Sequence, residues 1–339
     1  MLAFHHPDEA LHHPRFFLMR GRVRENYEIP ARAAALRQGL AALGITLIAA
    51  PAATRADAAV LHEAGYLDFL AEAYSLWSAL PEAGPEVVPN IHPSPEMLAE
   101  GRRPPRHPVA RAGLYMADAA CPIGPGTWQA ALGALGAALA AAEAAAEGRH
   151  AYALCRPPGH HAYAARAGGH CYLNNSALAA QRLRDRGARR VAVLDIDSHH
   201  GNGTQSLFWQ REDVLTVSVH ADPAGYYPWY VGFADEVGCC TNLNLPLPLG
   251  SGDGPWLEAI AAGMARIRDF GADALVVALG FDASEHEPLA ALRVTADGFA
   301  RAGEAIRRLG LPTVFCQEGG YAVDQLALLL RRFLEGFGR

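Results

Sequence analysis

The sequence predicts a single α/β domain whose parallel sheet is covered by helices on both faces. Short runs rich in β-branched residues alternate with longer runs rich in Ala, Leu and Arg, the pattern of repeated β-α-β units. No internal repeat or linker divides the 339 residues, a length that suits one large domain. Chemically reactive residues follow several of the apolar runs, where open parallel sheets bind their ligands.

Six short apolar runs are expected as strands of this sheet. A fully apolar run that ends at Gly, Pro or a polar residue is typical of a parallel strand buried on both faces. The expected strands are 45–50, 151–155, 190–197, 214–220, 273–280 and 312–316.

Eight segments with apolar residues at helical spacing are expected as the helices that cover the sheet. They are 31–43, 57–62, 66–79, 127–147, 174–187, 254–270, 295–309 and 324–336. Two stretches show no period and are expected as long loops: 81–108, rich in Pro and His, and 221–253, rich in Gly and Pro. Long loops in compact domains are often functional.

The composition excludes several classes of protein. Hydrophobic residues make up 51% of the chain and charged residues 19%, a balance typical of a globular enzyme and not of a disordered chain. The formal charge is −6 and the basic residues are scattered, so direct binding to nucleic acid is not expected. The N-terminal segment lacks the basic and apolar regions of a secretion signal.

The most apolar stretch and the cysteines indicate a soluble protein in a reducing compartment. The stretch Ala130–Ala146 is interrupted by Glu143 and by glycines, so it is expected as a buried helix and not as a membrane span. The six cysteines show no C-x-x-C spacing, and several lie in apolar runs where a thiol behaves as a small hydrophobic group. We therefore expect reduced cysteines and a cytoplasmic location.

The strongest chemical signal is the segment VLDIDSHHGNGTQ at the end of an expected strand. In an extended chain Asp195, Asp197 and His199 point to the same side, with successive members about 6.6 Å apart. A buried pair of carboxylates at a strand end would be unfavourable without a cation. These residues therefore indicate a metal site. The alternative is that Asp195 caps a turn and the histidines are solvated.

A third ligand is expected from another strand end, because a catalytic zinc keeps one coordination position open for water. Asp282 is placed for this role, since it follows the apolar run ALVVALG. A lone Asp after a strand is usually a turn residue, so its candidacy rests on the convergence of the strand ends. One His and two Asp ligands suit zinc and also ferrous iron.

The segment RPPGHHAY presents His160 and His161 after a rigid Pro-Pro-Gly turn. Neighbouring histidines hold different protonation states when their partners differ. Asp195 and Asn202 are the available partners: a carboxylate would make one ring cationic and leave the other as a neutral base. Two other histidine pairs are interpreted as solvent-exposed, namely His5-His6 and His12-His13.

Two glycine-containing segments complete the candidate site. In CQEGGYAV, Tyr321 follows a strand and two glycines, where its hydroxyl could donate a hydrogen bond to a developing oxyanion. In isolation such a Tyr would more often be a packing residue. In GGHCYLNN, Gly168 and Gly169 permit a close approach of the backbone to a ligand.

The motifs RPPGHH, GGHCYLNN, VLDIDSHHGNGTQ, GFD and EGGY occur in this order. Together they resemble the arginase–deacetylase superfamily, in its histone-deacetylase-like branch, from about residue 60 to the C-terminus. Within that branch the sequence is most similar to the bacterial acetylpolyamine amidohydrolases, through HEAGYLDFL, GPGTWQAAL and HADPAGYYPWYVGFADEVG. The resemblance implies one domain over 1–339, with an eight-stranded parallel sheet flanked by helices and with the 81–108 loop near the active-site mouth.

The resemblance also implies a role for each candidate residue. Zinc would be bound by Asp197, His199 and Asp282. The catalytic residues would be His161 as general base and then acid, His160 as its electrostatic partner held by Asp195, and Tyr321 as the group that polarises the carbonyl. A structural potassium ion would be bound by Asp195, Asp197, His199, Ser218 and Val219, and the substrate tunnel would be lined by Gly169, His170 and Tyr227. A homodimer is implied as well.

Three features depart from what an acetylpolyamine enzyme would have. His170 takes the place of a second aromatic wall, and a protonated ring there would repel a cationic chain. Val109 and Ala120 fall where acidic residues would receive the distal ammonium of a polyamine. The carboxylates that could replace them are Asp118, Glu100 and Glu96. Asn202 stands where some histone deacetylases have Asp, which makes a cationic His161 less expected at rest.

The sequence therefore predicts zinc-dependent hydrolysis of an N-acetyl or similar amide of a small amine, such as an acetylpolyamine. A protein lysine deacetylase with the same chemistry is the alternative, against which the long loop argues. A two-manganese ureohydrolase would need a second set of ligands, and the sequence offers one. A non-catalytic acyl-amine binding protein would have no need of Tyr321 and both histidines. The acyl chain and the leaving amine stay open.

Overall fold

Eight parallel strands form the centre of the molecule in this computed structural model, which describes residues 1–101, 103–289 and 291–338. Their order is β4-β1-β5-β10-β9-β6-β7-β8, and every neighbouring pair is parallel. Their bounds are β1 Leu2–His5, β4 Leu47–Ala49, β5 Ala151–Ala153, β6 Val191–Asp195, β7 Val214–Ala221, β8 Asn242–Leu247, β9 Ala274–Leu279 and β10 Thr313–Gln317. The predicted α/β class and eight-stranded parallel sheet are confirmed.

Two strands of this sheet were not among the six that the sequence predicts. β1 is a four-residue strand, and its apolar residues stand beside two histidines that read as a solvated terminus. β8 has the sequence NLNLPL and forms the edge of the sheet beside β7, so the segment 221–253 is not a continuous loop. Its two Asn residues are buried and bond to Gln205, whereas Leu243 and Leu245 are partly exposed, so the apolar pattern of a central strand is missing.

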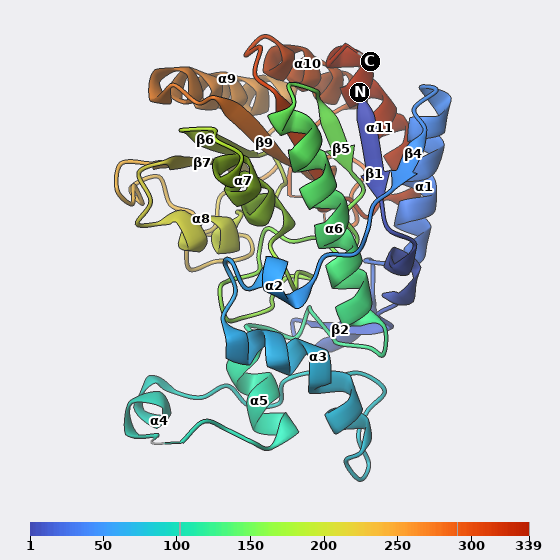
Figure 1. Cartoon of the computed structure of the whole chain (residues 1–339), viewed down its shortest axis with the longest axis vertical. Helices are drawn as coiled ribbons and strands as arrows, with labels where there is room; N and C mark the ends of the chain where they lie inside the picture. Colours follow the sequence, from blue (N-terminus) through green and yellow to red (C-terminus); the bar gives the residue numbers. More distant parts are fainter. Residues whose placement is uncertain (102, 290, 339) are drawn as a thin grey trace.

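Helices cover both faces of the sheet (Figure 1). The helices are η1 Pro7–Leu11, α1 Pro30–Ala42, α2 Arg55–Ala58, α3 Ala64–Ser78, α4 Pro95–Glu100, α5 Pro108–Tyr115, α6 Thr127–Ala146, α7 Asn175–Asp185, α8 Asn202–Phe208, α9 Asp253–Phe270, α10 Ala296–Arg307 and α11 Val323–Gly336. α6 and α7 pack on one face, and α1, α9, α10 and α11 pack on the other.

The central strands are apolar throughout because each contributes side chains to both layers. In β6, Ala192 and Leu194 belong to the core under α9 and α11, whereas Val191 and Val193 belong to the core under α6 and α7. A strand that is buried on both faces has no solvent-facing positions, so it cannot show the alternation of an exposed sheet. Because these strands are buried between two apolar layers, polar side chains are accommodated mainly at and beyond the strand ends.

Helix α6 is long and apolar enough to cross a bilayer, and 72% of its apolar window is buried inside the structure. It packs along α7 and against β1 and β5, as the sequence predicts for a core helix. Gly136 also lets the loop after β4 pass close to α6, since a Cβ there would lie 2.1 Å from the carbonyl oxygen of Pro51. All six cysteines are free thiols.

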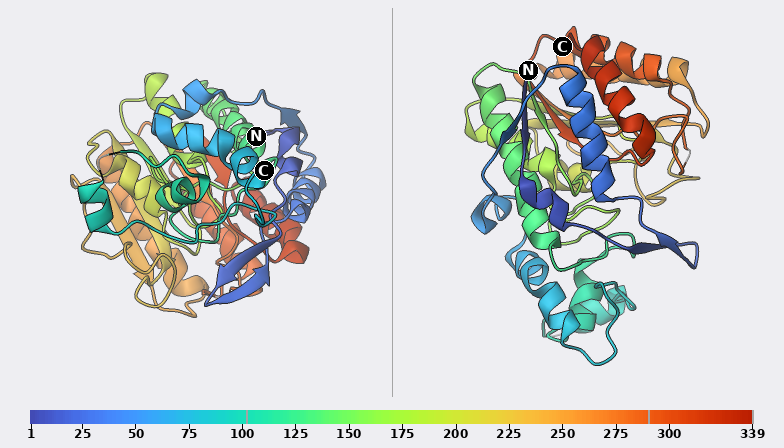
Figure 2. Two further views of the ribbon diagram at one scale, coloured as in Figure 1. Left: turned by 90° about the horizontal axis from the view of Figure 1, so that it is seen from below. Right: turned by 90° about the vertical axis from the view of Figure 1, so that its right-hand side faces the viewer.

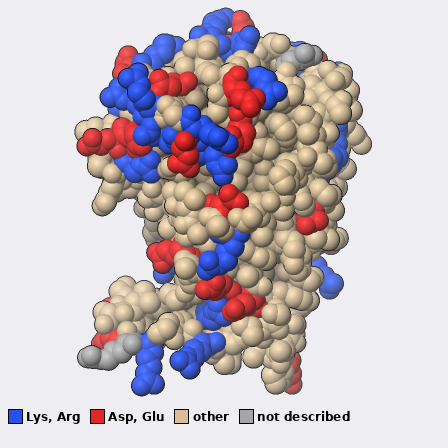
Figure 3. Space-filling model, viewed as in Figure 1, with Lys and Arg blue, Asp and Glu red and all other residues tan. Residues whose placement is uncertain are grey.

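The segment expected as a loop at 81–108 contains the short helix α4, which begins at the capping residue Ser94. With α3 and α5 it forms a layer beyond the carboxyl ends of the strands (Figure 1). A hairpin that the sequence analysis did not expect, β2 (Phe16–Met19) with β3 (Arg22–Glu25), projects from the body in the right-hand view of Figure 2. On the face shown in Figure 3, acidic and basic side chains are interspersed.

Candidate metal and catalytic site

Three side chains from two adjacent strand ends converge on one point. β6 and β9 are neighbours in the sheet, so Asp197 and His199, just beyond β6, meet Asp282, just beyond β9. His199 Nδ1 lies 3.1 Å from Asp197 Oδ1 and 2.9 Å from Asp282 Oδ2. All three side chains are buried, and their ligand atoms lie within 4.8 Å of one another.

The backbone around this trio is shaped to admit it. A Cβ at Gly280 would lie 2.1 Å from Asp197 Oδ2, and one at Gly319 would lie 2.5 Å from Asp282 Oδ2. The N–H of Gly319 also donates to Asp197 Oδ2 at 2.8 Å. The two glycines therefore leave room for carboxylate oxygens in the middle of the site.

The composition of the trio fits a divalent cation. Burial raises the pKa of Asp282, and the neighbouring Asp197 charge raises it further. Burial opposes a cationic His199, but Tyr226 and the two carboxylates together hold the pKa of that ring well above its usual range. Two carboxylates and an imidazole are donors that suit a divalent cation, which would take the place of the proton that His199 shares with them. Tyr226, which the sequence analysis did not single out, stacks on the His199 ring with centroids 4.7 Å apart.

The two histidines of the RPPGHH turn differ in their partners. His160 Nδ1 lies 2.8 Å from Asp195 Oδ2, and although burial disfavours the cation, Asp195 and Asp197 raise the pKa of His160 to about 10. His161 Nδ1 lies 2.5 Å from Asn202 Oδ1. Burial and then the His160 charge lower the pKa of His161 well below its usual value. At neutral pH the structure thus holds a cationic His160 beside a neutral His161.

A second group behind His161 was missed by the sequence analysis. The amide nitrogen of Asn202 donates to the hydroxyl of Tyr163 at 2.7 Å. That bond directs the carbonyl oxygen of Asn202 toward His161, so the ring keeps its proton on Nδ1 and leaves Nε2 free. Tyr163 lies two residues after the turn in the sequence, and no local sequence pattern predicts its hydrogen bond with Asn202.

Tyr321 and His161 line the same pocket, called the site pocket, which has a cavity volume of about 230 Å³. Its lining also includes His199, the hairpin residues Phe17 to Arg20, and the predicted tunnel residues Gly169, His170 and Tyr227. Burial raises the pKa of the Tyr321 phenol, which therefore stays protonated. None of the described residues of 81–108 is among those that line the site pocket.

The predicted tunnel residues have distinct surroundings. Gly169 has φ +50°, and a Cβ there would lie 2.4 Å from His161 Cδ2, so the backbone passes directly against the imidazole. His170 is buried and packs edge-on against Phe17 with centroids 5.7 Å apart. Burial lowers the pKa of His170 to about 4, so the ring is uncharged at neutral pH. A protonated His170 would repel a cationic substrate chain, and the neutral ring does not.

Of the candidate carboxylates, Asp118 reaches the site pocket. It is the one carboxylate among the described residues that line it. Tyr227 donates its hydroxyl to Asp118 Oδ2 at 2.7 Å, and Gly169 donates its N–H at 3.0 Å. Glu96 and Glu100 lie on the exposed helix α4, away from this lining.

The predicted potassium ligands lie next to one another across two strands. Asp195 at the end of β6 pairs with Ser218 of β7, and Val219 follows. The N–H of Asp197 donates to Asp195 Oδ1 at 3.1 Å, which folds the chain back over this point.

The interpretation of His12 as solvent-exposed is wrong. Its side chain is buried, bonds to Thr127 Oγ1 at 3.0 Å and lies 3.4 Å from Glu28 Oε2. Glu28 in turn pairs with Arg32 at 2.8 Å and with Arg156 at 2.9 Å. Burial lowers the pKa of His12 to about 3, so the ring is neutral. His13 is exposed as expected.

The first histidine pair is also less solvated than expected. His5 and His6 are both partly buried. His5 Nδ1 lies 2.9 Å from the guanidinium of Arg37, and His6 Nδ1 accepts the N–H of Asp8 at the start of η1.

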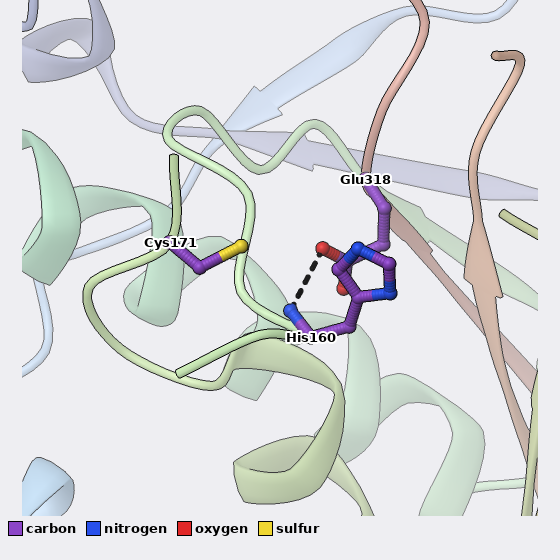
Figure 4. A group of neighbouring side chains, drawn as sticks. All are labelled: His160, Cys171 and Glu318. Atoms are coloured by element: carbon purple, nitrogen blue, oxygen red, sulfur yellow. Dashed lines mark hydrogen bonds between the residues drawn. The ribbon is translucent and has the colours of Figure 1, made fainter. Parts of the chain in front are cut away.

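A second cluster of potential ligands lies behind the catalytic turn: His160, Cys171 and Glu318 (Figure 4). In this cluster the carboxylate of Glu318 already accepts hydrogen bonds from neighbouring groups. Glu318 Oε2 accepts the N–H groups of Gly159 at 2.7 Å and His160 at 3.1 Å, and Oε1 accepts the hydroxyl of Ser176 at 2.7 Å. Burial raises the pKa of the Cys171 thiol, which disfavours the thiolate that a metal needs. This cluster is therefore interpreted as structural.

Known proteins are similar to this chain in both sequence and fold. The acetylpolyamine amidohydrolase of Burkholderia pseudomallei is 46% identical over 345 residues, covering 100% of this chain and 99% of that protein. Acetylpolyamine amidohydrolase 1 of Pseudomonas aeruginosa is 40% identical and covers 99% of both chains. A crystal structure of the B. pseudomallei acetylpolyamine aminohydrolase matches with a TM-score of 0.95 and 45% identity, over 100% of this chain and 98% of that chain.

The histone deacetylase domain matches residues 24–337, which include every catalytic and metal-binding candidate described above. The match spans nearly the whole chain and agrees with the fold and with the order of the motifs. This chain therefore belongs to the histone deacetylase domain family, a family of deacetylating hydrolases.

Proposed function

We propose that this protein is a zinc-dependent amidohydrolase that removes the acetyl group from a small N-acetylated amine such as an acetylpolyamine. The observation that carries the proposal is the meeting of three groups in one place: the Asp-His-Asp trio, a neutral imidazole at His161 and a protonated phenol at Tyr321. The names of the relatives support the substrate class.

The metal would be held by Asp197, His199 and Asp282. Zinc, when bound, lowers the pKa of a water ligand toward neutrality and polarises a carbonyl group. Ferrous iron suits the same donors. A structural potassium ion at Asp195, Asp197, His199, Ser218 and Val219 is proposed by family resemblance.

His161 is proposed as the proton carrier. Its Nδ1 proton is held by Asn202, so Nε2 accepts a proton from the attacking water and later delivers it to the leaving amine. His160, kept cationic by Asp195, stabilises the negative charge that develops nearby. Tyr321 donates its hydroxyl hydrogen bond to the oxygen of the substrate carbonyl as that oxygen becomes an oxyanion.

A protein lysine deacetylase is the second candidate, since the same family name covers it. The deciding experiment incubates zinc-loaded protein with N-acetylputrescine and with an acetyl-lysine peptide, and follows both products by mass spectrometry. We expect a higher kcat/KM for N-acetylputrescine. A preference for the peptide would reverse the assignment, and no turnover of any amide would refute the enzymatic proposal.

Replacing Asp118 by Asn should lower kcat/KM for N-acetylputrescine about tenfold or more, because the distal ammonium loses its charged partner at the site pocket. The matched neutral substrate is N-pentylacetamide, in which a methyl group replaces the ammonium, and its kcat/KM should change little. Equal losses for both amides would mean that Asp118 acts only by holding Gly169 and Tyr227. Arg20 also lines the site pocket, so kcat/KM is measured for a third amide as well. This is ω-acetamidopentanoate, whose far end is anionic.

Replacing His170 by Phe should leave the pH dependence of kcat/KM unchanged between about pH 5.5 and 8, since burial lowers the pKa of this ring to about 4. The lowered pKa keeps His170 neutral throughout that window, and a cation would appear only as the pH falls toward 4. Profiles with N-acetylputrescine for the two proteins test this. An acid-side decline near pH 6.5 that the variant lacks would contradict it.

A homodimer and a cytoplasmic location complete the proposal. Exposed apolar side chains in and beside α4 support an interface on that layer: Ile91, Met97 and Leu98.

A further inference from the structure

The backbone that carries Tyr321 is held from two sides by buried charged side chains. On the carbonyl side, Arg32 donates to the oxygen of Gly320 at 2.5 Å and to that of Glu318 at 2.6 Å. The same guanidinium lies 4.9 Å from the centroid of the Tyr321 ring. The preceding Gly320 has φ +118°, so this turn adopts a conformation that few other residues would accept.

On the amide side, the contact is made by Glu287. Its Oε1 accepts the N–H of Tyr321 at 2.8 Å and that of Ala322 at 3.0 Å, and its Oε2 lies 3.0 Å from the N–H of Tyr321. The side chain is 4% exposed, and no ion pair with it is found among the described residues. Its carboxylate is therefore committed to two backbone donors.

A second buried carboxylate does the same for the histidine turn. Glu318 accepts the N–H groups of Gly159 and His160, as the dashed line in Figure 4 illustrates for His160. Glu287 lies on the loop after β9 and holds the Tyr321 segment from outside, whereas Glu318 belongs to that segment and joins it to the histidine turn. Neither is among the residues that line the site pocket.

We propose that Glu287 is a positioning residue for Tyr321: by holding the amides of Tyr321 and Ala322 it sets where the phenol hydroxyl stands in the site pocket, and Glu318 holds the His160-His161 turn in the corresponding way. This inference rests on the proposed function where activity is the readout. A catalytic donor must stand within a few tenths of an ångström of its place, so a loosened backbone weakens it without removing it.

Two substitutions of Glu287 distinguish the loss of its hydrogen-bond acceptors from the loss of its charge. In Glu287→Gln, the amide oxygen can still accept both N–H groups, so the loop should keep its place. In Glu287→Met, a side chain of similar length removes both acceptors and leaves two buried donors unpaired.

The first measurement is hydrogen exchange in zinc-loaded protein, which needs no substrate. The peptide containing Tyr321 and Ala322 should exchange faster in Glu287→Met than in wild type, and its exchange should be unchanged in Glu287→Gln. Unchanged exchange in Glu287→Met would overturn the inference even if the enzyme proved to act on another substrate.

The second measurement is a double-mutant cycle with N-acetylputrescine. Glu287→Met should lower kcat about 10- to 100-fold with little change in KM, and Glu287→Gln should restore it to within about threefold of wild type. In a Tyr321→Phe background, Glu287→Met should lower kcat less than about threefold. Equal losses from Glu287→Met in both backgrounds would show that it does not act through Tyr321.

Discussion

Replacing Asp282 by Asn should give a folded protein that retains no metal ion after dialysis and loses more than about 10³-fold of its activity toward N-acetylputrescine. Asp282 supplies one of the two carboxylates that meet His199 Nδ1, at 2.9 Å from that nitrogen. Asn keeps the shape of the side chain and removes its charge, so the trio has one anion left to hold a divalent cation.

The same substitution makes an opposite prediction for the metal-free protein. Burial and the Asp197 charge raise the pKa of Asp282 in the fold. A carboxyl with a raised pKa destabilises the fold once the pH passes its unfolded value, so at neutral pH the metal-free wild type carries this penalty. Metal-free Asp282→Asn should therefore unfold at a Tm no lower than that of metal-free wild type.

Metal analysis and thermal unfolding of both proteins, with and without zinc, check these expectations together. Zinc should raise the Tm of wild type and should leave that of the variant unchanged. Asp222→Asn is the matched control, since Asp222 follows β7 at the same edge of the sheet but lies outside the trio. A variant that kept its metal and its activity would remove Asp282 from the site.

The convergence of Asp197, His199 and Asp282 was predictable because the local and the global sequence patterns agree there. Asp197 and His199 share a face by the two-residue period of an extended chain, and Asp282 follows a fully apolar run of the kind that forms a central strand. The structure adds the fact that β6 and β9 are neighbours, with Asp195 opposite Ala278. Order along the chain does not specify that pairing, so the convergence was an expectation until the fold was known.

Polar residues whose partners are distant in sequence were not predictable. His12 reads as a surface histidine, yet Arg156, 144 residues away, donates to its carbonyl oxygen, and Glu28 lies against its ring. Buried polar contacts of this kind have no local signature, because exposed and buried polar residues look alike in the sequence. For the same reason Glu287 was overlooked, although it stands only five residues after Asp282.

The strands that were missed show the limit of apolar runs as a signal. β8 pairs with β7 along its whole length, but half of its residues are Asn or Pro because it closes the edge of the sheet. Asn242 and Asn244 point into a buried network with Gln205, so these polar residues are structural and not loop-like. A side chain that is satisfied by tertiary hydrogen bonds lowers the strand signal without weakening the strand.

Replacing His161 by Ala should lower kcat about 10²- to 10⁴-fold while the protein keeps its full complement of metal, in contrast to Asp282→Asn. His161 bonds to Asn202 and is neutral because burial and the His160 charge lower its pKa. Because this pKa is lowered, the basic form persists as the pH falls through 6.5, so the acid limb of kcat/KM in wild type should lie below 6.5.

That acid limb should disappear in His161→Ala, and added imidazole should restore part of the activity by entering the vacated space. His200→Ala is the matched control, because His200 is a buried neighbour that bonds to Gln205 and lies outside the site pocket. Its loss should change stability more than the pH profile. If the acid limb stayed in place without His161, the proton carrier would have to be another group. The pairing of a cationic His160 with a neutral His161 would then only place a positive charge near the proposed metal site.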